Sequence, residues 1–102
     1  MTSNNEFEAK QDYLQSISLG ENTERLLVNL EFKKVILDYY LKDLVIKLTK
    51  ELVNYSVNTP EHNEIVRQLD AISLFDNFLH ELITEGQLAR EDLVYLETNP
   101  EE

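Results

Sequence analysis

Cysteine and tryptophan are absent from this chain of 102 residues, and glycine and proline occur only twice each. The lack of cysteine excludes a disulfide-stabilised scaffold and any zinc site built on thiolates. A β-rich fold needs turn residues after every short strand, and this chain has too few of them. The helix formers leucine, glutamate and lysine are abundant instead. The composition therefore predicts an all-α protein.

The chain also lacks a long uncharged apolar run. No stretch approaches the roughly 20 apolar residues that a membrane-spanning helix requires. Residues 1–7 (MTSNNEF) contain neither the basic region nor the apolar region of a signal peptide. We therefore expect a protein that does not span a membrane and is not secreted.

Common catalytic motifs are missing as well. Gly20 and Gly86 are too far apart for a P-loop or a dinucleotide-binding fingerprint, and no G-x-S-x-G is present. His80 follows Asp76 by four residues, so the two share a helix face, but Asn77 stands where a di-metal helical bundle has a glutamate. We expect no enzyme activity, no cofactor, no metal site and no small-molecule substrate.

Acidic residues outnumber basic ones by 20 to 9, which gives a formal net charge of −11. Residues 25–55 carry six bases and four acids, whereas residues 56–102 carry two arginines and eleven acids. Direct binding to nucleic acid is not expected, because the phosphates would be repelled. Two interpretations of the acidic half remain open. It pairs with the basic central segment, or it forms an acidic face that mimics DNA and blocks a nucleic-acid-binding enzyme.

The length favours one helical domain over residues 1–102. Its expected parts are an N-terminal helix or arm (1–20), a central helical segment (22–55), a second long helix (59–86), and a short helix with an acidic tail (87–102).

Helix ends are predicted from local signals. Gly20 is expected to stop an N-terminal helix over residues 6–18, and Gly86 to stop the second long helix, because glycine tolerates the left-handed geometry after a helix. Asn29 is a possible N-cap that allows a break within the central segment. Thr59 followed by Pro60 marks the start of the second long helix.

Two long helices near residues 30–54 and 60–85 have similar lengths and a short connection. This arrangement predicts an antiparallel helical hairpin, with the shorter helices flanking it.

The central helix is apolar on two faces, at about 100° per residue. One face is expected to pack on the second long helix and contains Leu37, Leu41, Leu44, Leu48, Leu52 and Tyr55. The roughly opposite face contains Phe32, Val35, Tyr39, Ile46 and Val53. This second face must also be covered, by the N-terminal helix, by the C-terminal segment or by a second protein chain. Its five residues are the candidate interface.

Two segments resemble sequences of small acidic proteins encoded by tailed bacteriophages. The first, ERLLVNLEFKKVILDYYLKD, spans residues 24–43. The pattern is carried by Leu26, Leu27, Asn29, Phe32, Lys33, Val35, Ile36, Tyr40 and Asp43. The second, DAISLFDNFLHELITEGQLA, spans residues 70–89, so that the two together cover 40 residues. Family members often have proline after the asparagine, where this chain has Leu30.

The resemblance implies a phage-encoded helical protein that is located in the host cytoplasm or in the virion. It implies a non-enzymatic structural or assembly role, in which the chain associates with itself or docks on another phage protein. The alternative is a small acidic inhibitor of a host protein that acts as a DNA mimic.

Overall fold

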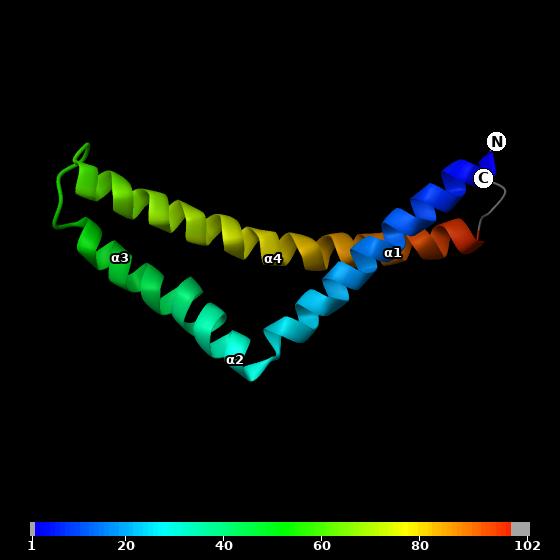
Figure 1. Cartoon of the computed structure of the whole chain (residues 1–102), viewed down its shortest axis with the longest axis horizontal. Helices are drawn as coiled ribbons and strands as arrows, with labels where there is room; N and C mark the ends of the chain where they lie inside the picture. The colour runs from blue at the N-terminus through cyan, green and yellow to red at the C-terminus, as the bar shows by residue number, and fades with distance from the viewer. Residues whose placement is uncertain (1, 99–102) are drawn as a thin grey trace. The chain divides into compact units, whose positions relative to one another are not determined.

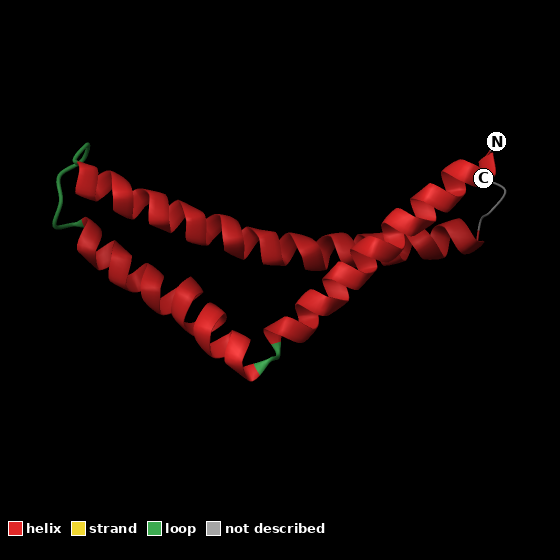
Figure 2. Cartoon of the chain, in the orientation of Figure 1, coloured by secondary structure: helices red, strands yellow, loops and turns green. Residues whose placement is uncertain are grey.

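The computed structural model describes residues 2–98, all of which lie in helices or in the short loops between them (Figure 1). The elements are α1 (Thr2–Leu27), α2 (Leu30–Phe32), the π-helix η1 (Lys33–Asp43), α3 (Leu44–Leu52) and α4 (Pro60–Thr98). Figure 2 shows the two loops in green, one after α1 and one before α4. No strand occurs in residues 2–98, so the prediction of an all-α protein is confirmed over the described chain.

The chain breaks after α1 because Asn29 caps the next helix. Asn29 has an extended backbone (φ −72°, ψ 129°), and its side-chain oxygen accepts a hydrogen bond of 2.9 Å from the backbone N–H of Phe32. Glu31 adds a negative charge in the first turn, where it suits the helix dipole. The break that the sequence allowed at Asn29 is therefore present, although Leu30 is not a proline.

The start of α4 follows from Thr59 and Pro60, as predicted. The backbone N–H of His62 donates to the Thr59 hydroxyl at 3.2 Å, and the N–H of Asn63 donates to the Thr59 carbonyl at 3.0 Å. Asn58, just before the cap, has a φ of 70°. Asparagine tolerates this left-handed geometry better than most residues, so the turn forms without a glycine.

Helix η1 was not foreseen. It is eleven residues long, and at its end the Leu44 N–H donates to the carbonyl of Tyr39, five residues back. A π turn holds more residues than an α turn, because each hydrogen bond reaches one residue further. Consecutive side chains in η1 are therefore separated by a smaller angle around the helix axis than in an α-helix. The adjacent residues Tyr40 and Leu41 of η1 both pack against the same core.

The contacts divide the chain into two compact units. Unit 1 comprises residues 1–25 and 79–102, and unit 2 comprises residues 26–78, so that α4 contributes to both. The expectation of one domain over residues 1–102 stays a prediction.

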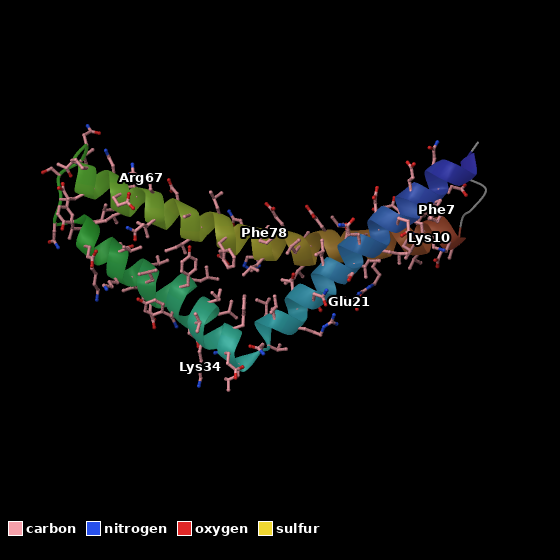
Figure 3. All side chains as sticks on the ribbon, in the orientation of Figure 1. Phe7, Lys10, Glu21, Lys34, Arg67 and Phe78 are labelled. Carbon is pink, nitrogen blue, oxygen red and sulfur yellow. The ribbon has the colours of Figure 1, made fainter. Side chains whose placement is uncertain are left out.

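In unit 1, α1 runs in the opposite direction to residues 79–98 of α4. Lys10 pairs with Glu97 at 3.8 Å, and Glu21 pairs with Arg90 at 3.4 Å, so residues further along one helix meet residues nearer the start of the other. Figure 3 marks Lys10 and Glu21 on α1. All four side chains are about half exposed, so these pairs add little stability.

The prediction that Gly20 and Gly86 stop helices is wrong, because both glycines lie inside helices that continue to Leu27 and Thr98. They lie where the two backbones cross. A Cβ on Gly20 would be 2.9 Å from the backbone oxygen of Leu82 and 3.1 Å from the Cα of Gly86. Glycine is needed here for close packing of two helices and not for a left-handed turn.

The flanking helices are consequently longer than expected. The N-terminal helix predicted over residues 6–18 is α1, which spans Thr2–Leu27 and includes residues that the sequence analysis gave to the central segment. No separate short helix forms after Gly86, because α4 is continuous to Thr98. The acidic tail at residues 99–102 lies outside the described residues.

The core of unit 2 lies between η1–α3 and the first part of α4. Leu48, Ile65 and Ile72 are each at most 6% exposed and pack together. The Tyr40 and Phe75 rings meet edge to face, with centroids 5.9 Å apart and an interplanar angle of 88°.

The inner face of the central helix was predicted largely as observed. Leu41, Leu44, Leu48 and Leu52 all pack on the core, as expected. Tyr55 was assigned to the same face, but it lies beyond the end of α3 and is 43% exposed. The expected face was therefore one turn too long.

Candidate interaction surface

The predicted interface residues are largely uncovered in unit 2. Val53 is 82% exposed, Val35 61%, and Tyr39 and Ile46 48% each. Phe32 is half-buried at the junction of α2 and η1. Four of the five residues therefore lie on the surface of a helix whose other side packs on α4.

Helix η1 divides these residues into two pairs. Val35 and Tyr39 lie on the π-helix, four residues apart, whereas Ile46 lies on α3 and Val53 caps its end. These five residues were predicted to share one face on the assumption of an α-helical turn throughout. Since a π turn holds more residues, the first pair is rotated about the helix relative to the second. The five residues therefore do not form one straight stripe.

Lysines surround this apolar surface. Lys34, Lys42, Lys47 and Lys50 are exposed and make no ion pair among the described residues of unit 2. Figure 3 shows the Lys34 side chain directed away from α4. Lys33 differs, because its Nζ lies 3.0 Å from the Asp38 carboxylate. Within unit 2, the acidic residues of α4 therefore do not neutralise the central lysines.

A groove of about 420 Å³ lies between η1–α3 and α4, and sequence reasoning missed it. Its lining residues are Leu41, Val45, Thr49, Leu69, Ile72, Ser73 and Asp76. The Thr49 hydroxyl already donates to the Val45 carbonyl at 2.7 Å, so it does not offer its proton to a ligand. Four of its seven lining residues are apolar, and the other three are Thr49, Ser73 and Asp76.

Two apolar residues of α4 also lie on the surface of unit 2. Leu74 is 69% exposed and Phe78 51%, while Phe75 between them packs on Tyr40. The sequence signal for this surface was the breadth of the apolar positions on the second long helix, which one partner helix cannot cover. Neither Leu74 nor Phe78 was included in the candidate interface.

The apolar core of the described chain is small. Its buried apolar residues are Leu48, Ile65, Ile72, Leu79 and Ala89, and no side chain is buried completely. By contrast, seventeen large apolar residues are exposed. Exposed apolar residues that are scattered singly are ordinary on a protein surface.

The titratable groups show one shift with a clear cause. Arg67 donates to the Glu64 carboxylate at 2.7 and 3.2 Å, and Gln68 donates to it at 3.4 Å. These bonds, that of Arg67 first, together with the positive charge of Arg67, lower the pKa of Glu64 below its ordinary value of 4.5. All three side chains lie on the surface, so this shift does not mark a buried catalytic acid.

Neither a metal site nor a membrane span is found in the described part of the chain. Residues 2–98 contain no group of three or more histidine, aspartate or glutamate side chains arranged to hold a metal ion. None of the described helices is long and apolar enough to cross a membrane. The chain matches no known protein family, no curated protein and no solved structure.

Proposed function

We propose that this chain is a non-enzymatic phage protein with a structural or assembly role, located in the host cytoplasm or in the virion. It acts through helix-mediated self-association or by docking on another phage protein. The observation that carries the proposal is the exposure of Val35, Tyr39, Ile46 and Val53 on a helix whose other side is packed. The phage setting rests on the resemblance of residues 24–43 and 70–89.

In this proposal the scaffold is an antiparallel hairpin of the central helix and α4. The hairpin fixes the inner face of η1–α3 through Leu48, Ile65 and Ile72, so the outer face is held ready for a partner. Removing an exposed valine or isoleucine side chain from water contributes about 1.5–3 kcal/mol when its burial is complete. Several such residues that are buried together stabilise an association more than a single residue does.

The test compares the wild-type protein with Ile46→Glu by light scattering over a concentration series. We expect the wild type to form a dimer or larger species and Ile46→Glu to remain a 12 kDa monomer with unchanged helicity. Asn63→Glu is the matched control, because it adds the same charge at an exposed position of α4. Self-association is excluded if the wild type stays monomeric at every concentration.

In the alternative role, the chain is a small acidic protein that inhibits a host protein by mimicking DNA. The charge distribution favours it, because unit 1 has three basic and twelve acidic residues, a net charge of −9. Inhibition by mimicry predicts that the wild type displaces duplex DNA from DNA-binding proteins of the host. Reversal of Asp70, Asp76, Glu81 and Glu85 to lysine would abolish this displacement while helicity persists.

A further inference from the structure

We infer that the outer face of α3 docks on the outer face of the C-terminal part of α4 in a second copy of the chain. The inference rests on the proposed function, because it names the partner and the contact for self-association. The basic–apolar face consists of Ile46, Lys47, Lys50 and Val53. The acidic–apolar face consists of Glu81, Glu85, Leu88, Asp92 and Tyr95.

The basic–apolar face combines charge with uncovered apolar area. Ile46, Lys50 and Val53 follow one another at spacings of four and three residues, which places them on one side of the helix. Lys47 lies beside Lys50 at a spacing of three. All four side chains are exposed, and neither lysine makes an ion pair among the described residues of unit 2. On this face, positive charge that forms no ion pair in unit 2 therefore lies beside exposed apolar side chains.

The acidic–apolar face repeats this pattern with the opposite charge. Its residues follow at spacings of four, three, four and three, which places them on one side of the helix. Leu88 and Tyr95 are 54% and 58% exposed. Glu81, Glu85 and Asp92 are exposed and make no ion pair among the described residues of unit 1.

Opposite charges favour contact between the basic–apolar face and the acidic–apolar face. Residues 33–53 contain five lysines and three acids, a net charge of +2, whereas unit 1 carries −9. Two copies that met through α3 alone would bring Lys47 and Lys50 against the same residues of the partner. Like charges in such a contact disfavour binding, whereas opposite charges favour the encounter and fix the register.

Each copy carries one face of each kind and therefore takes part in two contacts. The association closes into a symmetric pair or ring, or it grows as a filament.

The test is a charge exchange measured by light scattering on the full chain. One variant carries Lys47→Glu with Lys50→Glu, and the other carries Glu85→Lys with Asp92→Lys. Each variant alone has two faces of like charge, so we expect a monomer. A 1:1 mixture has two complementary contacts, so we expect it to regain the wild-type mass. A single chain with all four substitutions is expected to associate as well.

The control is Glu6→Lys with Glu8→Lys on α1, which changes the net charge as much as the second variant at exposed positions outside both faces. It is expected to keep the wild-type mass. The inference is overturned if the two exchange variants associate like the wild type, or if each is monomeric and their mixture stays monomeric. Both of those outcomes leave self-association of the wild type intact. A monomeric wild type instead removes the proposed self-association and this inference together.

Discussion

At the scale of single residues, the two glycines are the most informative positions. Glycine in a helix interior is about 1 kcal/mol less favourable than alanine, yet both glycines of the chain occupy such positions. The close approach of α1 and α4 explains this, because a Cβ on Gly86 would lie 3.0 Å from the Ser16 carbonyl oxygen and 3.1 Å from the Gly20 Cα. Each glycine therefore lowers the local helix propensity but allows the two backbones to approach closely at the crossing.

Substitution of Gly20 by alanine is predicted to destabilise the protein. The added Cβ meets backbone atoms, which cannot rotate away as a side chain can. Overpacking of this kind typically lowers stability by about 1–3 kcal/mol, against a gain of about 1 kcal/mol in helix propensity. Urea denaturation followed by circular dichroism measures the difference. Ser18→Ala, at an exposed position on the same helix, should not lower the midpoint. A higher midpoint for Gly20→Ala would contradict the crossing.

Glu64 gives a prediction for pH dependence. Its hydrogen bonds and its ion pair with Arg67 favour the charged carboxylate in the folded chain, so the folded pKa lies below 4.5. The resulting stabilisation is present above the unfolded pKa and is lost as the pH falls through the lowered folded value. NMR titration should show that Arg67→Gln raises the pKa of Glu64 towards 4.5. Gln68→Ala should raise it less, and an unchanged pKa in Arg67→Gln would refute the assignment.

At the scale of elements, the Asn29 cap controls where the central helix begins. The side chain accepts the hydrogen bond from Phe32, and its loss leaves a backbone N–H without that partner. Asn29→Ala is predicted to lower the free energy of unfolding by about 1 kcal/mol, within a range of about 0.5–2. Asn29→Asp keeps the acceptor and should be nearly neutral. The urea midpoints of the three proteins measure this, and equal midpoints for wild type and alanine would show that the cap is dispensable.

Local signals were sufficient for the starts of α2 and α4, whereas the role of the two glycines depends on non-local contacts. Thr59 and Pro60 predicted the start of α4 because capping depends only on neighbouring backbone groups. Gly20 and Gly86 were misassigned because their role depends on each other, across 66 positions of sequence. A glycine that ends a helix and one that allows a helix crossing look the same in a single sequence.

The candidate interface stays a prediction, and the helix geometry of its residues was not foreseen. Val35, Tyr39, Ile46 and Val53 were identified from apolar periodicity, and all four are exposed. Their alignment into one stripe assumed a uniform α-helical turn, and no residue in 33–43 signals a π-helix. The groove beside Val45 also depends on how η1–α3 meets α4, so periodicity alone did not reveal it.

At the scale of the whole molecule, the small core of the described residues bears on how the protein is stabilised. Five buried apolar residues contribute little against the conformational entropy of about a hundred residues. Burial of the exposed apolar residues against a second copy would add to the folding free energy as well as to the affinity. Folding and association are then linked, and the stability of each chain depends on its concentration.

This linkage predicts that the melting temperature rises with protein concentration. For a dimer, a tenfold increase in concentration adds about 1.4 kcal/mol per dimer, or about 0.7 kcal/mol per chain. For a domain of this size, that corresponds to a rise of roughly 3–6 °C. Differential scanning calorimetry over two decades of concentration measures the rise. Ile46→Glu removes the contact, so its lower melting temperature should not change with concentration, whereas Asn63→Glu should follow the wild type. If the wild type melts at one temperature throughout, the exposed residues of α3 do not contribute to folding through self-association, and the core of each unit alone sustains the fold.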